Sequence, residues 1–265
     1  MESALSAPRS RRRVLPARGS DDGYRDDHDV ALLLLRRHGV PAVFFIATHY
    51  VSERRLFWWD RIAYAVKHSP RERLAITYPT SMIFTLQAPS DRAHATRVLL
   101  RLVKSWHGLD LERFLTELAA AAGVSRDEDV ERRHANEMLM TWDHVRALRA
   151  AGMDVQSHTR SHRVLDTLPP EQLEDELVGS RRELERELGE AVEAISYPVG
   201  HTLREHPALR RAVASAGYRF GFTNDTGTQP LARDVDPLDL RRVGRERGMS
   251  TALFRATLAL PRLFD

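Results

Sequence analysis

Residues 141–162 read TWDHVRALRAAGMDVQSHTRSH, and this stretch decides the class of fold. Its first twelve residues carry apolar side chains at helical spacing, and Gly152 ends the predicted helix. The residues that follow, MDVQSH (153–158), predict a short strand. A helix that leads directly into a strand is the building unit of α/β proteins.

The same alternation continues toward the C-terminus. Pro169 and Pro170 open a helix whose leucines share one face and which ends at Gly189. The other elements expected in this half are strands at 192–198, 218–224 and 238–244 and helices at 203–217 and 250–263. Strands that alternate with helices predict a parallel sheet covered by helices.

The N-terminal half contains one further helix and strand of this type. DDHDVALLLLRRHG (26–39) predicts a helix with Gly39 as its C-cap, and VPAVFFIAT (40–48) is typical of a strand buried on both faces. Between this predicted strand and residue 141, the spacing of the apolar residues is mainly helical. We therefore expect one α/β domain over 19–265, a mainly helical insertion at about 52–138, and a disordered basic tail at 1–18.

Composition narrows the classes of protein and of site. The 265 residues include no cysteine, so any metal must be held by His, Asp or Glu. The formal net charge is only +3, and the arginines are interleaved with acids, so we expect no nucleic-acid partner. No apolar run approaches the roughly 20 residues of a transmembrane helix, and the N-terminus lacks the apolar segment of a signal peptide. This sequence indicates a cytoplasmic protein, unless the natural start lies upstream of Met1.

Two polar clusters lie where ligands bind in α/β folds, at the carboxyl ends of predicted strands. Asp21 and Asp22 are adjacent like charges, which favours a solvated turn or a neighbouring cation. His158 and His162 are four residues apart, a spacing that can bring both imidazoles to one point. With Asp22 they would form a three-ligand site for a divalent cation. Asp21 would then be free to deprotonate water, which points to metal-assisted hydrolysis of an amide or an ester.

Neither cluster is specific alone, because Asp-Gly is a common turn and the chain has twelve histidines. Their order and surroundings, however, resemble the polysaccharide deacetylase family, whose domain is the NodB homology domain. Four stretches carry the resemblance to the family's first four motifs: DDGYRDDHDVALLLLRRHGVPAVFFIAT (21–48), GMDVQSHTRSHRVL (152–165), ISYPVG (195–200) and AGYRFGFTND (216–225).

The resemblance implies a distorted (β/α) barrel and the removal of acetyl groups from N-acetylglucosamine polymers or acetylated xylan. It also implies that Asp21 is the catalytic base and that Asp22, His158 and His162 bind a divalent metal, usually zinc. The backbone N–H of Val199 would donate to the oxyanion. The substrate groove would be shaped by Tyr197, Pro198 and Gly200.

The sequence also departs from the family's pattern. ARGS (17–20) stands where an apolar strand usually precedes the two aspartates, so the first strand is expected to be weak or missing. Ser196 replaces an arginine that some members have, which leaves Asp21 without that partner. Arg242 stands where the family has its general-acid histidine; because arginine stays protonated and is a poor acid, we expect it to bind the substrate, by orienting it or by stabilising charge. His201 is another candidate acid, or an exposed loop residue.

These departures leave a second function open, that of a catalytically impaired relative that binds carbohydrate. A serine hydrolase is disfavoured, because the chain has no G-x-S-x-G segment. The expected partner in both surviving cases is an acetylated oligo- or polysaccharide.

Overall fold

The main sheet of the protein is parallel throughout and curled. The computed structural model describes residues 18–125, 127–227, 235–244 and 248–260. Within them six strands pair in the order β1-β2-β5-β6-β7-β8. The strands are β1 (Arg18–Ser20), β2 (Ala42–Ile46), β5 (Asp154–Ser157), β6 (Ala194–Ser196), β7 (Phe220–Thr226) and β8 (Leu240–Arg242). The expected distorted (β/α) barrel is thus confirmed as a curled half-barrel.

Helices lie between the successive strands as far as β7, as the sequence predicted, and the last helix follows β8. They are the π-helical turn Asp27–Ala31 with α1 (Leu32–Arg37), α2 (Thr48–Glu53), α7 (Trp142–Ala150), α8 (Pro170–Glu174), the π-helical turn Asp175–Gly179, α9 (Ser180–Leu188), α10 (Pro207–Ser215) and α11 (Thr251–Ala259). A single 3₁₀ turn, Leu165–Thr167, lies before α8. None of the described helices is both long and apolar enough to cross a membrane.

The strand predicted to be buried on both faces is β2. Phe44, Phe45 and Ile46 are each at most 1% exposed, although neighbouring side chains of a strand point to opposite faces of the sheet. One face contributes to a hydrophobic core with Val155 of β5 and Leu148 of α7. This central pair of strands fixes the edge at which the polar motif residues emerge.

The expected weak first strand is present but short. β1 has three residues and pairs with β2 in register, with Gly19 opposite Val43 and Ser20 opposite Phe44. Main-chain hydrogen bonds are independent of side-chain type, so ARGS can form this strand despite its polar sequence. The disordered tail predicted for residues 1–18 lies, up to residue 17, outside the described residues.

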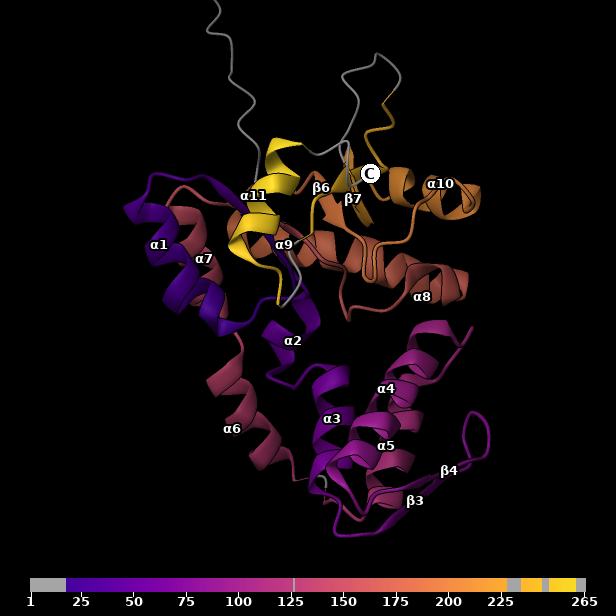
Figure 1. Ribbon diagram of the computed structural model, residues 1–265. Coiled ribbons are helices and arrows are strands. Elements are labelled where there is room, and N and C mark those ends of the chain that lie inside the picture. The colour runs from indigo at the N-terminus through magenta and orange to yellow at the C-terminus, as the bar shows by residue number, and fades with distance from the viewer. Residues whose placement is uncertain (1–17, 126, 228–234, 245–247, 261–265) are drawn as a thin grey trace, which may run out of the picture.

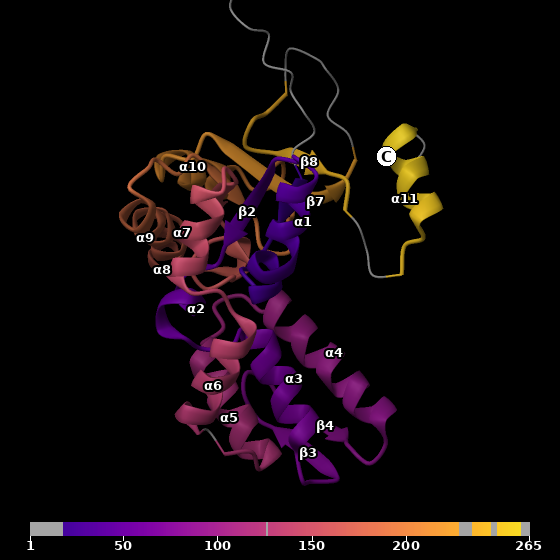
Figure 2. The same ribbon diagram turned by 90° about the vertical axis from the view of Figure 1, so that its left-hand side faces the viewer.

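The segment between β2 and α7 builds a second hydrophobic cluster. It contains α3 (Trp58–His68), the antiparallel pair β3 (Arg73–Ile76) and β4 (Met82–Thr85), α4 (Pro89–Ser105), α5 (Leu111–Ala122) and α6 (Glu128–Met138). In both ribbon views most of this segment lies beyond one end of the sheet (Figures 1 and 2). Its core includes Trp58, Leu99 and Phe114, each at most 1% exposed. That this segment is an insertion into a single domain stays a prediction.

The buried carboxyl group of Asp27, near β1, makes the stability of the folded chain depend on pH. Asp27 is 7% exposed and accepts a hydrogen bond from Ser20 Oγ at 2.6 Å. Burial, reinforced by the negative charges of Asp26, Asp22 and Asp21, raises the pKa of Asp27 from its ordinary 3.8 to about 7. The folded chain therefore holds a proton that the unfolded chain releases between these values, and stability falls as the pH rises through this window.

Asp27→Asn should consequently stabilise the metal-free chain at pH 8. A shift of one pKa unit corresponds to about 1.4 kcal/mol, so the gain should approach roughly 4 kcal/mol at pH 8 and vanish near pH 4. Urea denaturation of both proteins across this range measures it. An equal gain at both pH values would mean that Asp27 is not protonated in the folded chain.

Candidate active site

Three side chains predicted to bind a metal converge at the carboxyl ends of β1 and β5. Asp22 Oδ1 lies 3.4 Å from His158 Nε2 and 3.4 Å from His162 Nε2. One candidate ligand atom from each residue lies within 4.8 Å of the other two. His158 is 2% exposed, whereas Asp22 is partly open to solvent. The structure therefore brings the predicted ligand set together with one accessible side.

Hydrogen bonds orient His158 toward the other two groups. Its Nδ1 lies 2.8 Å from the carbonyl oxygen of Ser196, which can only accept, so Nδ1 carries the proton. When the histidine is neutral, this leaves the lone pair on Nε2, facing Asp22. His162 Nδ1 is buried without a hydrogen-bond partner among the described residues, which leaves its Nε2 as the atom aimed at Asp22.

Backbone strain is concentrated in the same motifs. Five described non-glycine residues have positive φ, and four of them belong to the motifs: Asp22, Thr159, His162 and Val199. Hydrogen bonds hold these conformations: Ala47 N donates to the Asp22 carbonyl at 3.1 Å, and His162 N donates to Thr159 Oγ1 at 3.1 Å. Strain held in this way is characteristic of functional sites.

The pKa values of the two histidines move in opposite directions. Burial, together with the charge of His158, lowers the pKa of His162 to about 3, so His162 is neutral near pH 7. Burial alone would lower the pKa of His158 as well, but the carboxylates of Asp21 and Asp22 raise it above its ordinary value. The two carboxylates thus favour positive charge at the cluster, which is why the pKa of His158 rises in the metal-free chain.

A divalent cation fits this donor set. Two imidazole nitrogens and one carboxylate oxygen are ligands that zinc and similar ions accept, and Nε2 of each histidine lies 3.4 Å from Asp22 Oδ1. The structure thus has the side chains to hold the ion that the sequence implied; the ion's identity is not set by them.

Asp21 has an arginine partner, contrary to the expectation from sequence. Arg242 Nη1 and Nη2 donate to Asp21 Oδ1 and Oδ2, both at 2.9 Å, and Ser196 Oγ donates to Oδ2 at 3.0 Å. Burial would raise the pKa of Asp21, but His158 and Arg242 hold it below its ordinary value. Arg242 also donates to the Thr223 carbonyl and to Asn224 Oδ1. Its guanidinium therefore holds Asp21 in this structure, and the substrate-binding role expected for it stays a prediction.

The third motif lies at the end of β6, and one of its residues is placed differently from the expectation. Tyr197 is 3% exposed and donates to the Leu238 carbonyl at 2.8 Å, so its side chain faces the core and not a groove. Pro198 is buried as well. Val199 has φ +63°, which is rare for a β-branched residue, and its N–H donates to no acceptor in the described part of the chain. That amide remains available for a ligand.

Gly200 follows in a conformation that requires glycine. Its φ is +72°, and a Cβ there would lie 2.2 Å from Asn224 N, the atom that donates to the Gly200 carbonyl. The turn that presents the Val199 amide is thereby pinned to β7.

Aromatic side chains from the segment after β2 form a wall that the sequence analysis did not identify. Trp59 packs edge-on against His162 with ring centroids 4.5 Å apart, and its Nε1 donates to Tyr24 Oη at 2.7 Å. Trp58 Nε1 donates to the His162 carbonyl at 3.2 Å. The adjacent tryptophans Trp58 and Trp59 are the feature of the sequence that could have indicated this wall. His201, by contrast, is exposed and lies 3.7 Å from Asp166, so it is not part of this cluster.

Comparisons of the sequence with known proteins identify the same family. A family model described as polysaccharide deacetylase matches residues 114–221, which include His158, His162 and the third motif but not Asp21 or Asp22. The Bacillus subtilis protein YxkH, provisionally named a polysaccharide deacetylase, is 30% identical over 117 residues, 44% of this chain. The match covers 40% of that relative, so less than half of its length is represented here.

Solved structures share the fold. A Streptococcus pyogenes deacetylase in complex with acetate superposes with a TM-score of 0.52 at 16% identity, covering 90% of this chain and 68% of the other. A polysaccharide deacetylase from Bacillus cereus gives 0.50 at 15% identity, covering 91% and 50%. The half-barrel is thus of the NodB type, and the match of residues 114–221 to the family model, with the curated relative, confirms the resemblance to the polysaccharide deacetylase family.

Proposed function

We propose that this chain is a metal-dependent hydrolase that removes acetyl groups from N-acetylglucosamine polymers or from acetylated xylan. The observation that carries the proposal is the convergence of Asp22, His158 and His162 around one point, with Asp21 beside it. His158 Nε2 lies 3.9 Å from Asp21 Oδ2, so the proposed base adjoins the proposed ligand set. A zinc or similar ion held there would polarise the acetyl carbonyl and acidify a water molecule.

Asp21 is the proposed general base. Its low pKa keeps it ionised near neutral pH, so it can accept a proton from the water that attacks the acetyl carbon. Arg242 and Ser196 fix the position of its carboxylate. As the water oxygen bonds to the acetyl carbon, negative charge develops on the carbonyl oxygen, toward which the Val199 amide would donate. Cleavage of the C–N or C–O bond then releases acetate, and the leaving atom takes up a proton.

The alternative function, a catalytically impaired relative that binds carbohydrate, is favoured by the ion pair between Arg242 and Asp21. Arg242 and Ser196 together occupy both carboxylate oxygens of Asp21, and a bidentate guanidinium makes a carboxylate a weaker base. Turnover, rather than binding, separates the two functions.

The direct test is acetate release from a panel of acetylated chito-oligosaccharides and acetylated xylan. The zinc-loaded chain should release acetate from one class, and a chelator should abolish the activity until zinc is restored. Binding of these sugars without acetate release would support the impaired relative. Release that persists in excess chelator would contradict the metal-dependent mechanism.

Replacement of Arg242 tests the role of its ion pair with Asp21. Arg242→Gln should reduce kcat/KM about 10- to 100-fold, the range seen when a group that orients an active-site ligand is lost. The acid limb of the pH profile should move to higher pH, because removal of the guanidinium raises the pKa of Asp21. Arg241→Gln is the matched control, since neighbouring strand residues point to opposite faces. A rate that rises in Arg242→Gln would instead mean that the ion pair restrains Asp21.

A further inference from the structure

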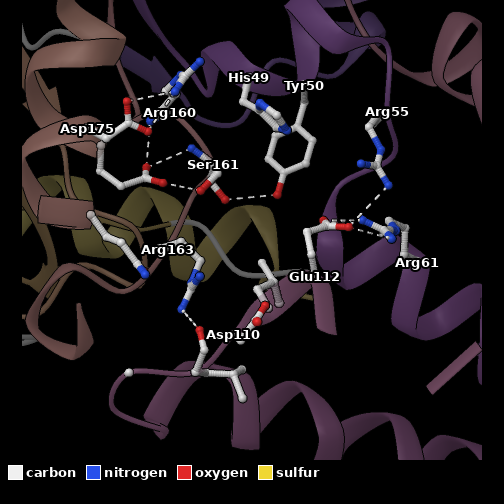
Figure 3. Close-up of a pocket in the computed structure, with 15 residues that line it drawn as sticks. His49, Tyr50, Arg55, Arg61, Asp110, Glu112, Arg160, Ser161, Arg163 and Asp175 are labelled. Atoms are coloured by element: carbon white, nitrogen blue, oxygen red, sulfur yellow. Dashed lines mark hydrogen bonds and ion pairs between the residues drawn. The ribbon is translucent and has the colours of Figure 1, made fainter. Parts of the chain in front are cut away.

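A polar cavity of about 480 Å³ lies apart from the cluster described above. Its walls come from α2, α3, the start of α5, the 160–163 loop and the helical segment 172–176, so it lies between the helical segment after β2 and the half-barrel (Figure 3). Neither aspartate of the first motif nor either of the motif histidines lines it. Its volume falls within the range of sites for small molecules.

Most charges on the cavity wall neutralise one another. Arg61 pairs with Glu112 at 2.8 Å, and Arg160 pairs with Asp175 at 2.8 Å (Figure 3). Glu176 accepts hydrogen bonds from the backbone N–H of Arg160 and from that of Ser161. The two arginine–acid pairs leave no unbalanced charge, whereas Glu176 is a buried carboxylate with no ion pair among the described residues.

Arg163 is a buried cation that makes no ion pair in the described part of the chain, because the charges of Glu176 and Asp110 act on it only from beyond ion-pair distance. It is 8% exposed, and its Nη2 donates to the Leu109 carbonyl at 2.9 Å. Within the described residues no carboxylate lies in ion-pair distance of its guanidinium, and that carbonyl is its one acceptor. Buried charges are normally paired, since removing a guanidinium from water is costly. A planar fork with unused donors beside a cavity is the arrangement that binds a carboxylate or a phosphate.

The start of α5 also favours an anionic ligand in the cavity. Asp110, Leu111 and Glu112 line the cavity, so the first turn of this twelve-residue helix faces it. The N-terminal end of a helix carries partial positive charge and favours anions. Asp110 uses its carboxylate to cap the helix by accepting from Arg113 N at 3.0 Å.

We propose that this cavity is a second binding site, which takes a sugar-sized molecule bearing a carboxylate or phosphate group, with Arg163 as the anchor of the oxyanion. The paired acids and arginines on the walls, with Gln172 at the rim, offer donors and acceptors to hydroxyl groups. The site does not depend on the function proposed above.

The site also contacts the loop that holds a proposed metal ligand. Arg160, Ser161 and Arg163 flank His162 in sequence, and Tyr50 Oη donates to the Ser161 carbonyl at 3.0 Å. A ligand in the cavity would therefore rest against the outer side of that loop.

Calorimetric titration of the full chain with glucuronate, glucose 6-phosphate and glucose tests the proposal. An anionic probe should bind, and neutral glucose should bind at least roughly 10-fold more weakly, as expected for a charge-assisted hydrogen-bonded pair. The affinity should be equal in the chelator-treated and the zinc-loaded chain. Anion binding that requires zinc, or no binding of either anion, would overturn the proposal.

Arg163→Gln should weaken binding of the anionic probe roughly 10- to 100-fold. The matched control is Arg92→Gln, because Arg92 also donates to backbone carbonyls, those of Val66, Lys67 and Ser69, but does not line the cavity. Unchanged affinity in Arg163→Gln would overturn the assignment. If that variant does not fold, a crystal of the wild-type chain soaked with glucose 6-phosphate decides: phosphate density on Arg163 supports the site, and density elsewhere or none overturns it.

Discussion

Replacing Asp21 by asparagine should reduce the rate of acetate release by about 10²- to 10⁴-fold, the range that loss of a general base produces. Asparagine keeps the size of the side chain and an acceptor oxygen for Ser196, but it cannot take a proton from water. Because Asp21 is not in the proposed ligand set, the variant should still bind one zinc ion per chain. Steady-state kinetics together with metal analysis measure both quantities.

Asp225→Asn is the control for this experiment, because Asp225 is exposed and lies in β7 rather than in the cluster. It should leave the rate unchanged. A full rate in Asp21→Asn would remove the proposed base from the mechanism, whatever the metal content.

Replacing His162 by alanine should produce the largest loss of metal. Loss of a group that merely orients a metal-binding histidine costs roughly 10- to 100-fold in affinity, and the loss of a ligand should exceed this. The low pKa of His162 keeps this residue in its neutral, ligating form near pH 7. The affinity of the wild-type chain for zinc should therefore fall only when the other ligands become protonated. Zinc titration against a competing chelator gives the affinities.

The matched control is His201→Ala, since this exposed loop histidine follows the third motif but lies outside the cluster. It should bind zinc as the wild type does. If His162→Ala also retained wild-type affinity, the metal site would have to be elsewhere.

The half-barrel and the convergence of the motif residues could be predicted because they depend on local pattern. The run that became β2 is apolar throughout, and it places residue 47 where its N–H can donate to the Asp22 carbonyl. Only three residues separate His158 from His162, so their convergence needs little information beyond their spacing. The positive φ values of Thr159 and His162 were not predictable from residue type.

The partner of Asp21 could not be predicted, because it depends on the curl of the sheet. Arg242 lies 221 residues after Asp21 on the opposite edge strand, and only the curvature of the half-barrel brings the two together. The direction of the Tyr197 ring could not be predicted for a related reason: the sequence places this residue at a strand end but does not give the side of the turn that its ring occupies. The Trp59 wall and the cavity at Arg163 likewise depend on how the helical segment packs against the barrel.

The central claim is that Asp22, His158 and His162 hold one divalent cation, and anomalous diffraction at the zinc absorption edge tests it most directly. Crystals grown with one equivalent of zinc should give one strong anomalous peak between Asp22 and the Nε2 atoms of the two histidines, at roughly 2.0–2.2 Å from each ligand atom. A peak at another place on the chain, or none in zinc-soaked crystals, would contradict the account.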